Sequence, residues 1–228
     1  MRSLALNRCG FYYFCERMLP YNFITVDGNT GAGKTTLAEM LAEEFGAKLI
    51  LEEFVANPFL KRFYADRERW GFHCELSFLI DRYHQLQETL QTLDLYGSLH
   101  IADYIFRKSL LYAKVNLDDE EFALFERVFH MVIKELPDPE MTIYVHSTSE
   151  RLVKNIAKRG RDFEQGVDKG YLDSVEKIYF EYFQSNQHLR ILVIDGDHLD
   201  FVGNKADYRK IVDAICKEYE PGITQLHL

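Results

Sequence analysis

The chain contains 228 residues, a length typical of one α/β domain and too short for two large ones. Apolar residues make up 47% and aromatic residues 14% of the sequence, which is enough for a buried core and excludes general disorder. The formal net charge of −9 argues against a protein that coats nucleic acid polymers and against a polybasic membrane binder. Any nucleotide that the chain binds is therefore expected to be small.

The four cysteines are scattered and indicate neither a disulfide framework nor a zinc module, which favours a reducing, cytoplasmic setting. No run of 18 apolar residues suggests a membrane span. We expect residues 1–20 to be an N-terminal tail, residues 21–220 to form a single domain and residues 221–228 to be a C-terminal tail. No internal repeat or Pro/Gly/Ser-rich linker marks a further boundary.

Five short runs rich in branched apolar residues predict β-strands, at residues 22–27, 48–51, 99–103, 141–146 and 191–195. Between them, apolar residues recur at helical spacing, as in 76–90, 122–133 and 211–219. Strands that alternate with helices favour right-handed crossovers and a parallel sheet covered on both faces. The predicted fold is a three-layer α/β fold with about five parallel strands.

A glycine-rich loop follows the first predicted strand and precedes a helical pattern. It fits G-x-x-x-x-G-K-[ST] in full and consists of Gly28, Asn29, Thr30, Gly31, Ala32, Gly33, Lys34, Thr35 and Thr36. Its N–H groups are expected to hold a triphosphate, aided by the positive end of the helix. Lys34 is expected to neutralise the β- and γ-phosphates, and the Thr35 hydroxyl to bind Mg²⁺. The loop alone does not separate transfer, hydrolysis, switching and binding.

Two further groups of charged residues point to phosphoryl transfer. Glu52 and Glu53 follow the second strand, where ligands bind in open parallel sheets, and one of them could accept a proton from a hydroxyl. Position alone leaves solvated strand-end charges equally open. Arg159 and Arg161 belong to a basic segment, with Gly160 between them, that could close over phosphates. The alternative is a cationic helix end that complements the helix dipole.

These pieces together resemble the deoxynucleoside kinase family, in particular its bacterial deoxyadenosine and deoxyguanosine kinase branch. The resemblance runs from about residue 23 to residue 219 and rests on five segments in order: GNTGAGKTT, LEEFVANPFLKRFY, ELSFLIDRY, ADY and KRGRDFEQG. It implies a P-loop kinase fold with an arginine-rich lid. It also implies ATP as the phosphate donor with Mg²⁺, and a homodimer.

The resemblance also implies roles for single residues. Glu53 matches the acid that takes the proton of the sugar 5′-hydroxyl, and Tyr64 and Glu164 match the residues that hold the 3′-hydroxyl. Arg159 and Arg161 match the lid arginines. On residue type alone, Tyr64 and Glu164 would more simply be an ordinary half-buried aromatic and a helix-start acid.

Base recognition in the family uses an amide and, seven residues later, an arginine on one helix; here these positions hold Glu75 and Arg82. Because a carboxylate accepts but does not donate, Glu75 suits a base edge that offers N–H donors, as guanine and adenine do, unless it is protonated. Arg82 would donate to a purine acceptor. A solvated Glu75 and an Arg82 paired to another element are the alternative.

After the third strand the family usually has an acid followed by arginine and serine, but this chain has Asp103 and Tyr104. Asp103 keeps the acid, which is expected to contribute to Mg²⁺ binding or to share the base role with Glu53. Tyr104 lacks the arginine's charge, and Arg107 or Lys108 is the candidate replacement from the next turn. Residues 195–204 resemble the loop that packs against the donor adenine.

The sequence thus predicts an ATP-dependent kinase that phosphorylates the 5′-hydroxyl of a deoxynucleoside, with a deoxypurine favoured over deoxycytidine. Its predicted partners are the nucleoside, ATP and a second copy of the chain, with no nucleic acid polymer and no membrane. A monophosphate kinase of the thymidylate kinase type and a catalytically silent nucleotide-binding subunit remain as alternatives.

Overall fold

The computed structural model describes residues 19–53, 57–90, 98–164 and 166–226. Its centre is a six-stranded, fully parallel sheet with the order β2-β3-β1-β4-β5-β6. The strands are β1 (Phe23–Gly28), β2 (Lys48–Ile50), β3 (His100–Ala102), β4 (Met141–His146), β5 (Arg190–Asp195) and β6 (Gly222–Leu226). The fold class expected from the sequence is confirmed, with one strand more than predicted.

The additional strand corrects the predicted C-terminal tail at residues 221–228. Gly222–Leu226 pairs in parallel with β5, from Arg190 opposite Gly222 to Ile194 opposite Leu226. Its side chains are half-buried or exposed, because an edge strand has one neighbour and contributes little to the core. Its short sequence GITQL therefore lacks the continuous apolar run by which the other strands are recognised.

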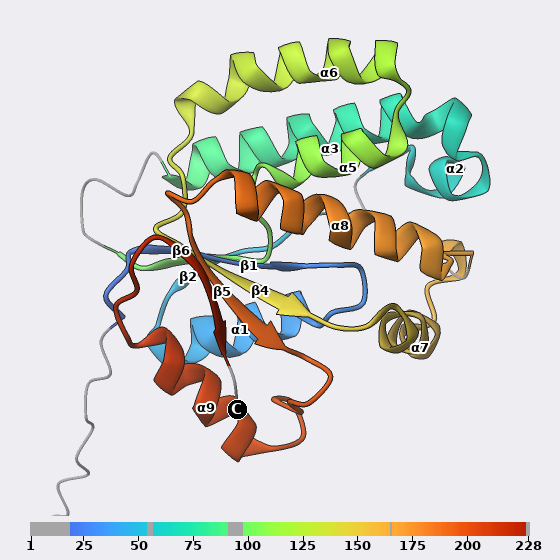
Figure 1. Cartoon of the computed structure of the whole chain (residues 1–228). Helices are drawn as coiled ribbons and strands as arrows, with labels where there is room; N and C mark the ends of the chain where they lie inside the picture. Colours follow the sequence, from blue (N-terminus) through green and yellow to red (C-terminus); the bar gives the residue numbers. More distant parts are fainter. Residues whose placement is uncertain (1–18, 54–56, 91–97, 165, 227–228) are drawn as a thin grey trace, which may run out of the picture.

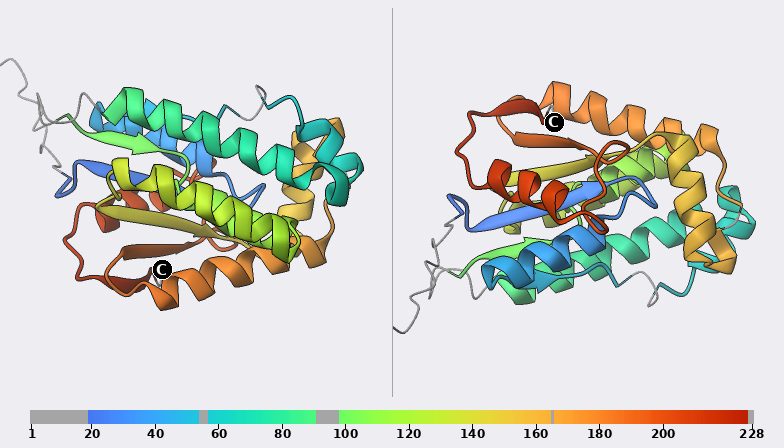
Figure 2. Two further views of the ribbon diagram at one scale, coloured as in Figure 1. Left: turned by 90° about the horizontal axis from the view of Figure 1, so that it is seen from above. Right: turned by 90° about the horizontal axis from the view of Figure 1, so that it is seen from below.

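Helices cover both faces of the sheet (Figure 1). On one face lie α1 (Lys34–Phe45) and α9 (Lys205–Ile215), and on the other lie α3 (Arg67–Leu90), α5 (Lys108–Asn116), α6 (Asp119–Val132) and α8 (Lys169–Ser185). Beyond the carboxyl ends of the strands stand α2 (Leu60–Ala65) and α7 (Ser149–Arg159) (Figure 2). Two 3₁₀ turns, η2 (Ile133–Glu135) and η3 (Asp162–Glu164), follow α6 and α7.

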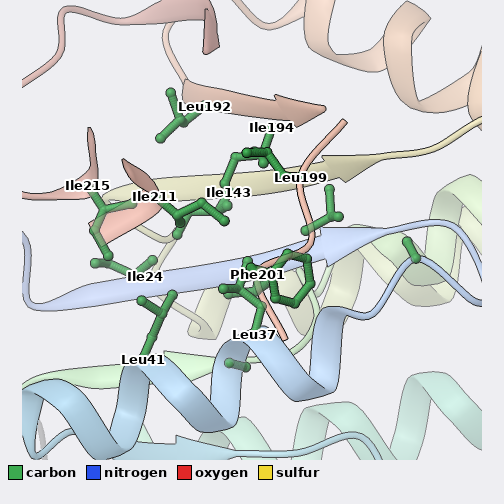
Figure 3. Packing of buried hydrophobic residues seen from close by; sticks show 14 of the residues in the cluster. Ile24, Leu37, Leu41, Ile143, Leu192, Ile194, Leu199, Phe201, Ile211 and Ile215 are labelled. Atoms are coloured by element: carbon green, nitrogen blue, oxygen red, sulfur yellow. The ribbon is translucent and has the colours of Figure 1, made fainter. Parts of the chain in front are cut away.

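The larger hydrophobic core lies between the sheet and the α1/α9 layer (Figure 3). Leu37 and Leu41 are one helical turn apart on α1 and fully buried, as are Ile211 and Ile215 on α9. They pack with strand residues such as Ile24 in one cluster. This packing fixes the first turn of α1 against β1, and with it the loop between them.

On the opposite face, aromatic side chains fill the core. Phe125 and Phe129 of α6 are fully buried with Leu79 of α3, which confirms the helical stripes expected there. Tyr179 and Phe183 of α8 pack on β4 and β5 in a neighbouring cluster. None of the described helices has the length and apolar character of a membrane span.

We expect removal of residues 221–228 to destabilise the protein, because it deletes the β5–β6 hydrogen bonds and uncovers β5. At about 1 kcal/mol net per backbone hydrogen bond, the free energy of unfolding should fall by roughly 2–5 kcal/mol. Urea unfolding followed by circular dichroism measures the change. Removal of residues 227–228 alone is the control, and an unchanged midpoint after the longer truncation would mean that β6 contributes nothing to the sheet.

Candidate active site

The predicted phosphate loop lies between β1 and α1, as expected. Gly28 has a φ of +150°, and a Cβ there would lie 2.5 Å from the carbonyl oxygen of Val145, so no larger residue fits. Gly33 has a φ of +88° and directly precedes α1. The loop therefore opens at the N-terminus of a helix, where unpaired N–H groups favour an anion.

Neighbouring helices hold this loop through side-chain amides. Asn29 donates from Nδ2 to the carbonyl of Leu172 on α8 at 2.8 Å, and Asn155 of α7 donates to the carbonyl of Gly31 at 3.0 Å. Lys34 donates from Nζ to the Asn29 carbonyl at 3.0 Å. The Asn29 side chain thus anchors the loop, while its backbone shapes the cradle.

Thr35 and Asp103, the predicted metal ligands, are brought together. The Thr35 hydroxyl donates to Asp103 Oδ2 at 2.6 Å, and the backbone N–H of Glu52 donates to Oδ1 at 2.7 Å. A hydroxyl and a carboxylate oxygen side by side suit Mg²⁺, which prefers oxygen ligands and usually keeps several waters and phosphates. Among the described residues no group of three or more His, Cys, Asp or Glu could hold a metal, so phosphates would have to complete such a site.

Of the two acids after β2, Glu52 lines the cavity. The prediction that Glu53 is the acid in the site is therefore wrong. Glu53 is exposed and does not line the cavity. Glu52 accepts from Nε and Nη2 of Arg82 on Oε1 and from Nζ of Lys108 on Oε2, the last at 2.8 Å. Burial opposes its ionisation, but the charges of Arg82 and Lys108 outweigh burial and hold the pKa of Glu52 well below its usual range.

The second cation beside Glu52, in addition to Arg82, comes from α5. Tyr104, at the position where an arginine was expected, is fully buried and donates to Gln85 Oε1 at 2.6 Å. Arg107 pairs with Asp138, away from the cavity, at 3.2 Å. Of the two candidates named from the sequence, the structure therefore places Lys108 in the cavity.

The lid residues lie on the other side of the cavity. Glu164 is buried and accepts from Nη2 of Arg159 and from Nη1 of Arg161, the latter at 3.2 Å. The ring of Tyr64 on α2 lies 5.8 Å from that of Phe163 in η3, between centroids. At the start of α8, the guanidinium group of Arg67 stacks on the ring of Tyr171, with its carbon 4.0 Å from the ring centroid. These contacts join η3 to α2 and the start of α8 to α3.

Glu75 and Arg82 lie on one face of α3 and are both buried, which excludes a solvated Glu75. Asn116 of α5 donates from Nδ2 to Glu75 Oε1 at 2.7 Å. Burial raises the pKa of Glu75 to about 7, although the Arg82 charge and the Asn116 hydrogen bond oppose the shift. Arg82 donates to Glu52 and, from Nη1, to the hydroxyl of Ser109 at 2.8 Å.

One cavity joins most of the predicted site residues at the carboxyl edge of the sheet. It is lined, among others, by Thr30, Lys34, Thr35, Tyr64, Glu75, Arg82, Asp103, Arg159, Arg161 and Glu164. The loop at residues 195–204 lies beside the phosphate loop, since a Cβ on Gly33 would meet the Phe201 ring at 3.2 Å. The cavity therefore runs from the phosphate loop to the α3 face that holds Glu75.

Sequence reasoning missed Asp27, a fully buried carboxylate at the end of β1. It accepts from the N–H groups of Gly28 and Ile105, at 2.7 and 3.2 Å, and from the Tyr179 hydroxyl at 3.0 Å. Burial raises its pKa. Asp27 could have been identified from the sequence, because it is an acid at the end of an apolar strand, directly before the glycine-rich loop. Asn116 had no such signal, because its partner Glu75 is 41 residues away.

Residues 24–219 match the model of the deoxynucleoside kinase family, so the chain belongs to that family and is a deoxynucleoside kinase. A deoxyguanosine kinase of Bacillus subtilis (strain 168) is 36% identical over 193 residues, which cover 83% of this chain and 93% of that protein. A deoxyadenosine/deoxycytidine kinase of the same organism is 28% identical over 210 residues, covering 88% and 95%. The resemblance predicted from the five sequence segments is confirmed.

A solved structure of deoxyadenosine kinase from M. mycoides, with dCMP and a flexible dCDP bound, superposes with a TM-score of 0.74. It is 23% identical, and the match covers 84% of this chain and 97% of that one. At this identity the likeness establishes the fold. The structure of the same enzyme with dATP gives the same TM-score.

The burial of Glu75 predicts that stability depends on pH. Because its pKa of about 7 exceeds that of an unfolded glutamate, the folded state keeps the proton longer, and stability falls as the pH rises from about 4.5 through 7. Glu75→Gln should remove this dependence and raise the free energy of unfolding at pH 8 by ~3 kcal/mol. Urea unfolding between pH 4.5 and 8 measures it.

Glu88→Gln is the matched control, since Glu88 is an exposed carboxylate on the same helix. Parallel stability curves for the wild type and Glu75→Gln across this pH range would show that Glu75 is not held protonated by burial.

Proposed function

We propose that this kinase transfers the γ-phosphoryl group of ATP to the 5′-hydroxyl of a purine deoxynucleoside. The observation that carries the proposal is the half-buried Glu52 carboxylate, which faces a cavity shared with the phosphate loop and with the lid arginines. ATP would lie with its triphosphate on residues 28–36, and the nucleoside would lie between Glu52, Tyr64 and Glu75. The product would be a deoxynucleoside 5′-monophosphate.

Glu52, in place of the predicted Glu53, would accept the hydrogen bond and then the proton of the 5′-hydroxyl. Its two cationic partners keep it ionised, which an acceptor requires. In a loose phosphoryl-transfer transition state the hydroxyl proton leaves late, so orientation by a carboxylate of low basicity is sufficient. A carboxylate here would repel a substrate phosphate, which argues against a monophosphate kinase of the thymidylate kinase type.

Mg²⁺ fits the neighbouring pair Thr35 and Asp103, which would hold it through the hydroxyl and the carboxylate. When bound, the ion would offset the negative charge of the β- and γ-phosphates. Lys34 and the lid arginines Arg159 and Arg161 would hold phosphate oxygens. In this structure the arginines are paired with Glu164, which would have to share them with the phosphoryl group.

The sugar and base contacts follow from the same cavity. Tyr64 and Glu164, which both line it, would hold the 3′-hydroxyl. Glu75 accepts one hydrogen bond from Asn116 on Oε1, which leaves Oε2 for an N–H donor of the base. Ionised Glu75 suits guanine, which offers N1–H and N2–H₂ on one edge, whereas protonated Glu75 could also donate to adenine. The similarity to deoxyguanosine and deoxyadenosine kinases supports a purine.

A homodimer, implied by the family resemblance, would use the layer formed by α3 and α6. Three large apolar side chains are exposed there, Ile80 on α3 and Leu124 and Met131 on α6, with Met131 74% exposed. Figure 1 shows α6 as the outermost helix of this layer. A monomeric mass in sedimentation equilibrium at micromolar concentration would contradict the dimer.

We expect Glu52→Gln to lower kcat for the deoxynucleoside by at least about 10²-fold, because the amide cannot take the hydroxyl proton. Binding of ATP should persist, since Glu52 is not part of the phosphate loop. Glu53→Gln is the matched control and should leave kcat within about threefold of wild type, as Glu53 is exposed. Coupled detection of ADP release measures both, and the reverse ranking would return the role to Glu53.

We expect the wild type to prefer deoxyguanosine or deoxyadenosine over deoxycytidine and to release no ADP with nucleoside monophosphates. Glu75→Gln should change the ranking of kcat/KM among the deoxynucleosides, because an amide offers a donor as well as an acceptor. One mismatched hydrogen bond is worth about tenfold or more. An identical ranking in the variant would place base recognition outside Glu75.

A further inference from the structure

The ammonium group of Lys108 is buried in the active-site cavity although lysine is rarely buried. Its side chain is 6% exposed, and its Nζ donates to Glu52 Oε2 at 2.8 Å. An ammonium group carries three N–H donors, and one of them is used by Glu52. The Nζ also lies 5.5 Å from the centroid of the Tyr112 ring, and Lys108, Lys34 and Glu52 line one cavity.

Two buried acids place Lys108 at this point. Asp103 ties the segment before α5 to Thr35 and to the N–H of Glu52, and Asp27 accepts from the N–H of Ile105. The N–H of Lys108 then donates to the Ile105 carbonyl at 3.0 Å and starts the helix. The same carboxylates that shape the phosphate loop therefore fix the base of the lysine side chain.

Lys108 and Lys34 line the same cavity, Lys34 at the end of the phosphate loop and Lys108 at the start of α5. An anion placed between the two ammonium groups would be attracted by both.

Building on the proposed function, we propose that Lys108 is a catalytic residue whose ammonium group bridges Glu52 and the phosphoryl group during transfer. In this step the 5′-oxygen forms the new bond to the γ-phosphorus, and the bond to the β,γ-bridging oxygen breaks with its electron pair leaving on ADP. The hydroxyl proton passes to Glu52. Lys108 keeps its protons and donates hydrogen bonds to a phosphoryl oxygen.

The bridge lets Lys108 contact both groups at once, because one N–H donor binds Glu52 and the others remain for a phosphoryl oxygen. Arg82, which binds the other carboxylate oxygen and Ser109, keeps Glu52 oriented meanwhile.

Lys108→Met tests the proposal, because methionine keeps the length of the side chain and removes the charge. We expect kcat for the deoxynucleoside to fall by at least about 10²-fold, while KM for ATP and for the deoxynucleoside each change by less than about fivefold. Lys108→Arg should recover part of kcat. Lys114→Met, an exposed lysine on the same helix, is the control and should behave as wild type.

A binding measurement tests the contact with the phosphoryl group without turnover. The wild type should bind Mg²⁺-ADP with aluminium fluoride, which mimics the phosphoryl group in transfer, more tightly than Mg²⁺-ADP alone. Lys108→Met should lose most of this gain while its affinity for Mg²⁺-ADP stays within about threefold.

The assignment of Lys108 would be overturned if aluminium fluoride raised the affinity for Mg²⁺-ADP equally in wild type and variant, or in neither. It would also be overturned if the loss of activity in the variant lay wholly in KM. Failure of the proposed function is a different result, since it would appear in the wild type as a lack of ADP release with every deoxynucleoside.

Discussion

The candidate active site depends on a carboxylate held between two buried cations. Arg82 and Lys108 would be costly to bury as cations alone, and Glu52, whose side chain is 16% exposed, offsets both charges. The three charges come from the loop after β2, from α3 and from α5, which pack together only in the complete fold. Such a group adds little net stability compared with apolar residues. Its benefit is that it sets the position and the charge of the carboxylate that lines the cavity.

The sheet and the phosphate loop could be predicted from the sequence because each depends on local patterns. Five apolar runs and the spacing of Gly28, Gly33 and Lys34 suffice for them. Which of Glu52 and Glu53 faces the cavity could not be predicted from the sequence. Neighbouring residues at a strand end point to opposite sides, and the side that faces the cavity is decided by Arg82, 30 residues later, and Lys108, 56 residues later. The sixth strand was not predicted, for a related reason. Its side chains are half-buried or exposed, so its sequence contains no continuous apolar run.

The departure from the family pattern at Tyr104 is compensated in the structure. Tyr104 replaces a charged residue, and its buried hydroxyl is satisfied by Gln85, which in turn donates to the Leu51 carbonyl at 2.6 Å. The ring lies 5.9 Å from the guanidinium carbon of Arg82 and so helps to hold that arginine against Glu52. The neutral Tyr104 thus helps to position Arg82, and Lys108 provides the second cation beside Glu52. The sequence showed the replacement, whereas the compensation required the packing of α3 against α5.

The contacts that join η3 to α2 and the start of α8 to α3 are formed by aromatic rings. Tyr64 meets Phe163 ring to ring, and Arg67 stacks on Tyr171, so neither pair depends on a directional hydrogen bond. Parting such pairs exposes ring faces and a guanidinium group to water, at a cost of about 0.5–2 kcal/mol for each pair. Separation of either pair would therefore require no helix to unfold, because each contact joins side chains and leaves the backbone hydrogen bonds of the helices in place.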